Sequence, residues 1–121
     1  MPGLNIVVLT DDAERFRGAL TLALAQRALG ADCRIFLQLD AVRLLAPTLS
    51  GPRDAEHATQ GLPTLPLLIG EALDDGVAFV ACQSGLALAG IEATQLDPRI
   101  AAGGPVSFLQ SLTADDRLLL V

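Results

Sequence analysis

Short runs of apolar residues alternate along the chain with segments in which apolar residues recur at helical spacing. A run that is apolar at every position is typical of a strand covered on both faces, as in a parallel sheet. The pattern predicts strands at residues 4–9, 33–39, 77–81, 100–102 and 117–121, and helices from Asp11 to Gly30 and at residues 41–45, 65–73, 86–89 and 105–112. Their alternation predicts a three-layer α/β/α fold with a mainly parallel sheet of about five strands.

Residues that cap helices set the expected boundaries of the first helix. Asp11 followed by Glu14 has the form of a capping box, in which the two side chains accept hydrogen bonds from backbone N–H groups of the first turn. The first helix is predicted to end at Gly30, because helices commonly end at a residue in the left-handed conformation, which glycine adopts readily. The first two strands and this helix therefore predict a right-handed strand–helix–strand crossover.

The polar segment 48–61 shows no helical or strand periodicity and is predicted to be a loop without regular structure. Unstructured segments of this length are uncommon in small domains, and they often form lids or binding loops. The segment contains His57, the only histidine of the chain. The pattern assigns no structure to residues 91–96 and does not predict the order of the strands.

Composition limits the classes of function. A chain of 121 residues is long enough for one domain and too short for two, so residues 1–121 are expected to form a single domain. Apolar residues make up 51% and charged residues 18%, which excludes a disordered chain and predicts that self-association covers some apolar surface. The net charge of −6 and the absence of Trp and Tyr argue against nucleic-acid binding.

Missing residue types and motifs exclude further chemistry. The chain has no lysine, so Schiff-base chemistry and a phosphate-loop lysine are excluded, and its single histidine excludes a two-histidine metal site. No G-x-G-x-x-G motif follows any predicted strand, and neither a cofactor nor a metal is expected. The apolar N-terminal run is short and has no basic residue before Arg15, so we expect no signal peptide or membrane span and a cytoplasmic location.

Cys82 is the candidate catalytic residue. It ends a predicted strand and begins the turn Gln83-Ser84-Gly85 into a short helix. Sites in open α/β sheets lie outside the carboxyl ends of the strands, and the N–H groups that begin a helix favour a thiolate. Ser84 is expected to cap this helix and donate a hydrogen bond to the sulfur, with Gln83 and Gly85 as supporting residues. The alternative is that Cys82 is an unreactive core residue, as many cysteines are.

Three further residues are candidates for a crevice or gate at this site. Thr10 and Asp11 follow the first predicted strand and therefore belong to the same edge of the sheet as Cys82. His57 can pair with Cys82 if segment 48–61 folds over it, and the alternative is a solvated loop histidine. Cys33 begins a strand at the opposite edge and is expected to be a core residue.

The segment from Val77 to Ile91, VAFVACQSGLALAGI, resembles the DsrE/DsrF-like sulfur-relay family. In that family an apolar strand delivers a cysteine into a turn and a short helix, followed by Gly-Ile or Gly-Val. The first strand and helix and the segment from Leu96 to Val121 are similar to the family as well. The resemblance implies a three-layer α/β/α domain that assembles into trimers or hexamers and carries sulfur as a persulfide on Cys82.

Two kinds of function follow from these observations. The first is an intracellular sulfur-relay protein, of sulfurtransferase type, that accepts sulfur on Cys82 and passes it on between donor and acceptor proteins. The second is a non-catalytic oligomeric module of the same fold that binds a small ligand or a partner segment. A cysteine peroxidase is less favoured, because no resolving cysteine is evident.

Overall fold

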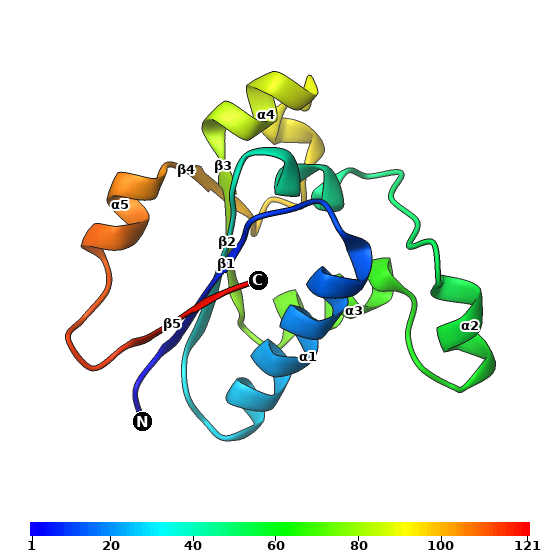
Figure 1. Ribbon diagram of the computed structural model, residues 1–121, viewed down its shortest axis with the longest axis horizontal. Coiled ribbons are helices and arrows are strands. Elements are labelled where there is room, and N and C mark those ends of the chain that lie inside the picture. Colours follow the sequence, from blue (N-terminus) through cyan, green and yellow to red (C-terminus); the bar gives the residue numbers. More distant parts are fainter.

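The computed structural model describes all 121 residues and is built around one five-stranded sheet (Figure 1). The strands are β1 (Leu4–Val8), β2 (Cys33–Leu37), β3 (Ala78–Cys82), β4 (Ala101–Gly103) and β5 (Arg117–Leu120). They lie in the order β4-β3-β2-β1-β5, and every neighbouring pair is parallel. All carboxyl ends therefore lie at one edge of the sheet and all amino ends at the other.

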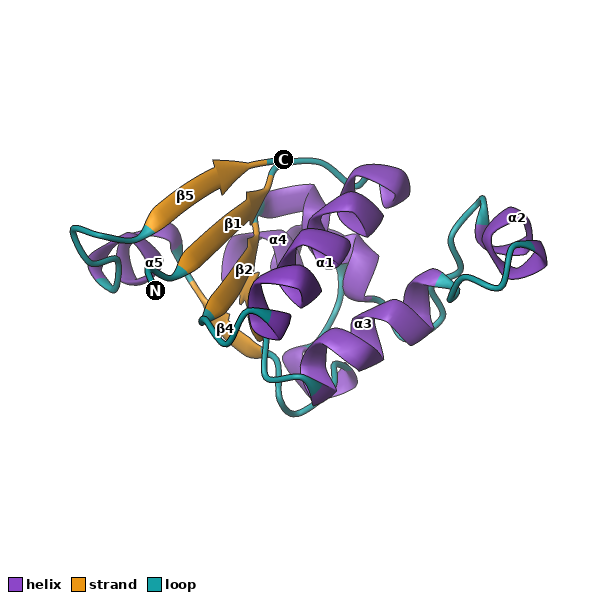
Figure 2. Ribbon diagram, turned by 90° about the horizontal axis from the view of Figure 1, so that it is seen from below, coloured by secondary structure: helices purple, strands orange, loops and turns teal.

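Helices cover both faces of this sheet. They are α1 (Ala13–Ala28), α2 (Asp54–Thr59), α3 (Leu65–Asp74), α4 (Gln83–Ala89) and α5 (Pro105–Gln110), with the 3-10 helices η1 (Leu39–Leu45) and η2 (Ala93–Gln95). Figure 2 shows α1 and α3 side by side on one face, α5 on the other, and α2 extending away from the rest. The predicted three-layer α/β/α fold is confirmed, and the sheet is parallel throughout.

The two faces of the sheet are covered unequally. On the face beneath α1 and α3, alternate strand residues are completely buried. On the other face the short α5 supplies little more than Phe108, whose ring stacks on Phe36 with a centroid distance of 5.1 Å. Leu118 and Leu120, both in β5, remain exposed. The third layer is therefore thin, and apolar surface is left open along the β5 edge.

The capping box predicted at the start of α1 is wrong. The N-cap residue is Asp12, whose Oδ1 accepts a hydrogen bond of 2.9 Å from the backbone N–H of Arg15. Glu14 does not reach back to the helix start, because its carboxylate lies instead against Arg17 and His57. The predicted helix end is confirmed, since Gly30 follows α1 with φ of 81°.

The prediction of an unstructured loop over residues 48–61 is also wrong, because this segment contains α2. Asp54, at the start of α2, fixes this helix to α1 and to the segments on either side of it. Its Oδ1 accepts hydrogen bonds from Arg17 Nη2 at 2.7 Å and from the backbone N–H of Leu65 at 2.8 Å. Its Oδ2 accepts one from the backbone N–H of Gly51 at 2.7 Å. Arg17 lies far away in the sequence on α1, so no local pattern predicts this arrangement.

Helix α4 begins earlier than predicted, directly at the end of β3, and packs against η1. Gly85 makes this contact possible. A Cβ atom on Gly85 would lie only 2.3 Å from the backbone carbonyl oxygen of Leu39. Leu39 itself has φ of 49°, a left-handed conformation that costs a residue with a side chain roughly 1–2 kcal/mol. The close contact of two backbones thus sets the position of α4 over the carboxyl ends of β2 and β3.

We expect Gly85→Ala to lower the free energy of unfolding by about 1–3 kcal/mol, because the new methyl group must displace the Leu39 backbone. Gly18→Ala is the matched control, since nothing lies within 4 Å of a Cβ atom on Gly18 in α1. Gly18→Ala should raise the free energy of unfolding by about 0.5–1 kcal/mol, because alanine is more favourable than glycine in a helix interior. Urea unfolding measures both variants, and equal effects of the two would contradict the assigned contact.

Candidate functional site

Cys82 lies at the carboxyl edge of the sheet, as the last residue of β3 and the N-cap residue of α4. Only 3% of the residue is exposed. Its side chain makes no capping hydrogen bond to the first turn of α4. Both α4 and η1 pack over this end of β3, so the thiol lies in the core of the free chain.

The three residues that follow Cys82 have different environments. Gln83 and Ser84 are exposed in the first turn of α4, and the Ser84 hydroxyl makes no hydrogen bond to the sulfur. The prediction that Ser84 caps this helix is wrong, because the chain enters the helix at Cys82 itself. Gly85 is buried and contacts the Leu39 backbone. Gln83 lines a hollow of about 360 Å³ between α4 and the segment that leads to η2.

The residues predicted to form a crevice or gate do not share a hollow with Cys82. The Thr10 hydroxyl accepts a hydrogen bond of 3.4 Å from the backbone N–H of Asp12. Asp11 lines a different hollow, of about 470 Å³, which also includes Glu14, Arg43 and residues of the segment before α2. Neither this hollow nor the one at Gln83 includes Cys82 in its lining.

His57 is not brought to Cys82. It lies on α2, with its Nε2 atom 3.1 Å from Glu14 Oε2, and in both ribbon views α2 is far from the junction of β3 and α4 (Figures 1 and 2). The catalytic pair weighed from the sequence is therefore not formed. His57 is not a solvated loop residue either, since its side chain is only 18% exposed in contact with α1.

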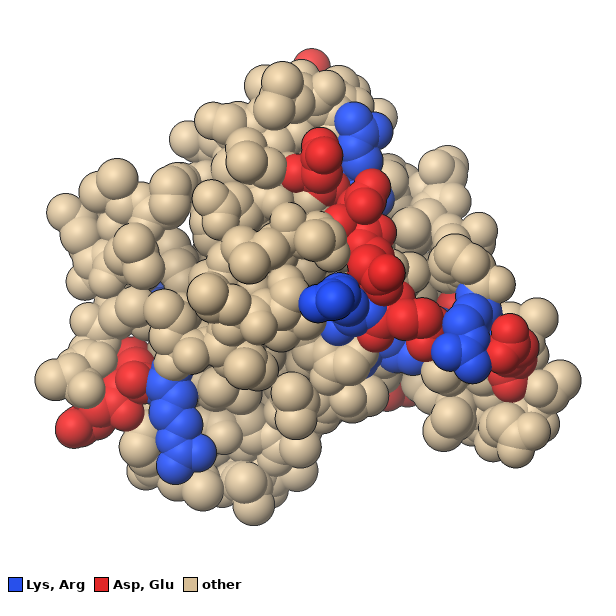
Figure 3. Space-filling model, in the orientation of Figure 1, with Lys and Arg blue, Asp and Glu red and all other residues tan.

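His57 belongs instead to a group of charged side chains that joins α2 to α1. Glu14 lies 3.2 Å from Arg17, 3.1 Å from His57 and 3.6 Å from Arg53. Partial burial raises the pKa of the Glu14 carboxyl, but the hydrogen bonds from His57 and Arg17 lower it by more. In Figure 3 acidic and basic side chains gather in a band that ends over α2, whereas uncharged residues cover most of the rest of that face.

Cys33 is the first residue of β2 and lies at the amino edge of the sheet, as predicted. It is a core residue, and burial raises the pKa of its thiol to about 11. The thiol is therefore protonated at neutral pH. Both cysteines are free, and the parallel strands place them at opposite edges, so the geometry offers no disulfide between them.

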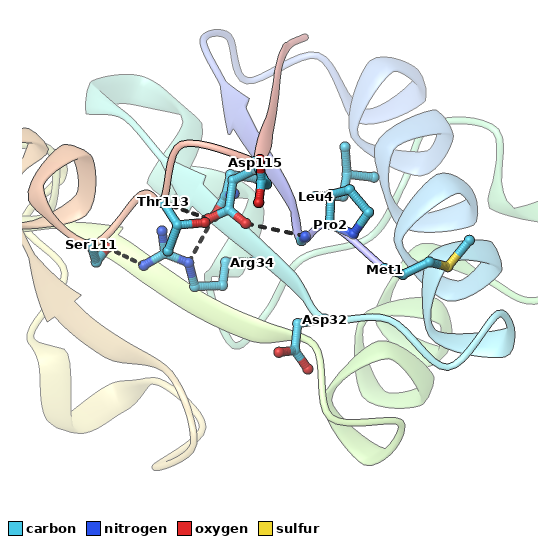
Figure 4. A pocket seen from close by; sticks show the side chains of 11 residues that line it. Met1, Pro2, Leu4, Asp32, Arg34, Ser111, Thr113 and Asp115 are labelled. Carbon is cyan, nitrogen blue, oxygen red and sulfur yellow. Dashed lines mark hydrogen bonds between the residues drawn. The ribbon is translucent and has the colours of Figure 1, made fainter.

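A hollow of about 740 Å³, which the sequence pattern does not predict, lies at the amino edge of the sheet (Figure 4). It is formed by the first residues of the chain, the start of β2 and the loop between α5 and β5. Arg34, an arginine inside the otherwise apolar strand sequence CRIFL, was the available signal. No three His, Cys, Asp or Glu side chains come together to hold a metal ion, and none of the helices has the length and apolar character needed to cross a membrane.

Residues 5–120 match the model of the DsrE/DsrF-like family. The fold is similar to the YchN protein of E. coli, with a TM-score of 0.77 and 20% identity, each chain being covered over its full length. It is also similar to MTH1491 of Methanobacterium thermoautotrophicum, described as a protein of unknown function, with a TM-score of 0.75, 14% identity and full coverage of both chains.

A third solved structure with this fold is BT1422 of Bacteroides thetaiotaomicron, a conserved protein of unknown function. It has a TM-score of 0.71 and 22% identity, and the alignment covers 98% of the present chain and 94% of that protein. No curated protein matches the sequence. At these identities the solved structures support the fold, and none of their descriptions states an activity.

The contacts of Asp54 predict an acid-sensitive contribution to stability. Partial burial raises the pKa of the Asp54 carboxyl, but the N–H groups of Leu65 and Gly51 and the Arg17 guanidinium lower it by more. A lowered pKa stabilises the fold above the unfolded value, and this stabilisation is lost as the pH falls through the folded value. We therefore expect the difference in thermal midpoint between the wild type and Asp54→Asn to be largest near neutral pH and to shrink below about pH 4.

The control for this measurement is Asp32→Asn, because the Asp32 side chain is 94% exposed and its contact with Arg27 is long, at 3.4 Å. This variant should unfold at nearly the wild-type temperature at every pH. A difference between wild type and Asp54→Asn that stays constant down to the acid range would contradict the assigned role of the Asp54 carboxylate.

Proposed function

The chain belongs to the DsrE/DsrF-like family, and on that basis we propose that it is an intracellular sulfur-relay protein that carries sulfur as a persulfide on Cys82. The observation that carries the proposal is the position of Cys82. It is the only cysteine at the carboxyl edge of the parallel sheet, where sites of such folds lie, and it stands at the junction of β3 and α4. Cys33, at the other edge, has a pKa of about 11 and is unsuited to attack.

The proposed transfer needs no oxidant, reductant or cofactor. The Cys82 thiolate attacks the outer sulfur of a donor persulfide, a new S–S bond forms, and the donor's own S–S bond breaks. The donor leaves as a thiolate, and the outer sulfur keeps its proton, so that Cys82 becomes a persulfide. Attack by an acceptor thiolate on this outer sulfur then regenerates the Cys82 thiolate. The acceptor and donor are further proteins of the relay.

Burial of Cys82 means that transfer depends on movement of its cover. Helices α4 and η1 lie over the thiol, and their contact runs through Gly85 and the Leu39 backbone. The left-handed conformation of Leu39 stores free energy in the closed arrangement, because a leucine relaxes to negative φ when the contact opens. Opening of this contact therefore exposes the sulfur at low cost, also to a small persulfide.

A second candidate function is a non-catalytic oligomeric binding module, and the burial of Cys82 favours it. In this case the ligand occupies the hollow of about 470 Å³ whose lining includes Asp11, Glu14, Arg43 and Arg53, and Cys82 contributes only to packing. The two functions differ in a direct way, because only the first requires sulfur to be loaded on Cys82.

We also propose that the protein is a homo-oligomer, a trimer or hexamer, in the cytoplasm. Exposed apolar side chains on α5 and the edge strand β5 support this, namely those of Val106, Leu109, Leu118 and Leu120. An edge strand that carries apolar side chains is prone to associate with another chain, and a second copy is the partner always available.

To test sulfur transfer, the purified protein is incubated with cysteine persulfide and its intact mass is measured. We expect the wild type and Cys33→Ser to gain one sulfur atom, about 32 Da, and Cys82→Ser to gain none. A small thiol acceptor added afterwards should remove the sulfur. Cys33→Ser is the matched control, because both variants remove one buried thiol.

Circular dichroism establishes that both variants keep the wild-type fold. The same incubation in urea, where both cysteines are exposed, verifies that the donor is active. Absence of the mass gain in the folded wild type, or a gain carried by Cys33, would overturn the persulfide proposal and favour the binding module.

The native mass tests the oligomer. Light scattering should give three or six times the chain mass of 12.6 kDa. Replacement of both Leu118 and Leu120 by Glu should reduce the assembly, because carboxylates cannot be buried in an apolar contact without a large cost. Leu22→Glu, at an exposed position of α1, is the control and should leave it intact. A monomeric wild type would contradict the prediction.

A further inference from the structure

Arg34 differs from the other arginine that the fold encloses. Arg17 is buried and lies 2.7 Å from the Asp54 carboxylate, so its charge is compensated. Arg34 has no carboxylate partner. Its Nε donates to Asn5 Oδ1 at 2.8 Å, and its Nη1 donates to the hydroxyl of Ser111. Its Nη2 is buried and has no hydrogen-bond partner at all.

The surroundings hold this guanidinium in one place. Its central carbon lies 4.7 Å above the centre of the Phe108 ring. Asn5, which orients Nε, is itself 2% exposed on the neighbouring strand β1. A partly buried cation that makes no ion pair and donates only to neutral side chains costs free energy, and an apolar side chain of similar size would avoid that cost. The charge of Arg34 is therefore unexplained by packing and is oriented as a receptor for an anion.

Arg34 lies on the wall of the hollow of about 740 Å³ at the amino edge (Figure 4). Three carboxylates, of Asp32, Asp115 and Asp116, line the same hollow. Backbone N–H groups of Thr113 and Gly3 donate to Asp116 at 3.0 and 3.1 Å, and they lower the pKa of its carboxyl. Asp115 is exposed and makes no hydrogen bond within the protein. A multiply charged anion such as phosphate would be repelled by this lining.

We propose that the hollow binds a small organic carboxylate that also carries a positive charge, of which an α-amino acid is the simplest example. The ligand carboxylate replaces the Ser111 hydroxyl on Nη1, so that a charge-assisted hydrogen bond takes the place of one to a neutral group, while Asn5 still holds Nε. The ligand ammonium group faces Asp115 and Asp116. Ser111 does not lose its other partner in this exchange, because its hydroxyl already donates to the carbonyl of Phe108 at 2.6 Å.

This site is independent of the persulfide proposal. It lies at the amino edge of the sheet, and Cys82 lies at the carboxyl edge. The side chains of Met1 and Leu4 form the apolar part of the lining and can contact the side chain of the ligand.

The test is a titration of the full chain followed by the NMR signal of the Arg34 Nε–H group. The probes are L-leucine, L-serine, isocaproate, which is leucine without its amino group, and isoamylamine, which lacks the carboxylate. We expect at least one of the two amino acids to bind, isocaproate to bind more weakly than L-leucine, and isoamylamine not to bind. Failure of both amino acids to bind, or binding of isoamylamine alone, would overturn the proposal.

Variants separate the two charges of the ligand. Calorimetry should show that Arg34→Met binds L-leucine and isocaproate about tenfold more weakly, or worse, than the wild type does. Asp115→Asn should lower the affinity for L-leucine and leave the affinity for isocaproate unchanged. Arg15→Met is the control, because Arg15 is an exposed residue of α1 that makes no ion pair, and it should bind as the wild type does.

Thermal unfolding distinguishes a binding role from a structural one. Without ligand, Arg34→Met should unfold close to the wild-type temperature, because removal of the enclosed charge offsets the loss of the hydrogen bonds to Asn5 and Ser111. A clear loss of stability in this variant together with unchanged affinity for L-leucine would show that Arg34 serves packing, and would overturn the proposed site.

Discussion

The parallel direction of all strands is the constraint on which the arrangement of side chains depends. Because each strand runs the same way, residues that begin strands meet at one edge and residues that end strands meet at the other. Cys82, the β2 end and η1 meet at the carboxyl edge, whereas Cys33, Arg34 and the start of the chain meet at the amino edge. The two cysteines are thereby separated, and so are the two sites proposed for this protein.

At the carboxyl edge, packing and access to the thiol oppose each other. Gly85 allows the backbone of Leu39 to approach α4 so closely that the end of β3 is covered, which stabilises the fold and encloses Cys82. The same contact requires an unfavourable conformation of Leu39. A cover that contains a strained residue opens at lower cost than a relaxed one, and the sulfur transfer that we propose for Cys82 needs such an opening.

The small number of charged residues makes the placement of each of them informative. Arg17, Asp54, Glu14 and His57 form one group that fastens α2 and the preceding segment to α1. Arg34 donates instead to the neutral side chains of Asn5 and Ser111 and makes no ion pair. The first arrangement compensates its charges internally and is explained by folding alone. The second leaves a cation without an ion pair on the wall of a hollow, and this is the basis of the amino-acid site that we propose.

Local patterns in the sequence were sufficient for the strands, the long helices, the glycine stops and the parallel α/β class, because these depend on side-chain periodicity and on glycine within a few neighbouring residues. The position of Cys82 at a strand end was predicted for the same reason, together with the resemblance to the family. Contacts between distant residues decided the rest. The contact of Asp54 with Arg17 holds α2 against α1. The contact of Gly85 with the Leu39 backbone covers Cys82. The hollow at Arg34 is lined by the first residues of the chain and by the loop before β5. The first two contacts leave no local signal, because each exists only once the chain has folded and brought distant segments together. Arg34 within the apolar strand β2 is an unusual residue that the sequence shows, but the other walls of its hollow come from distant segments.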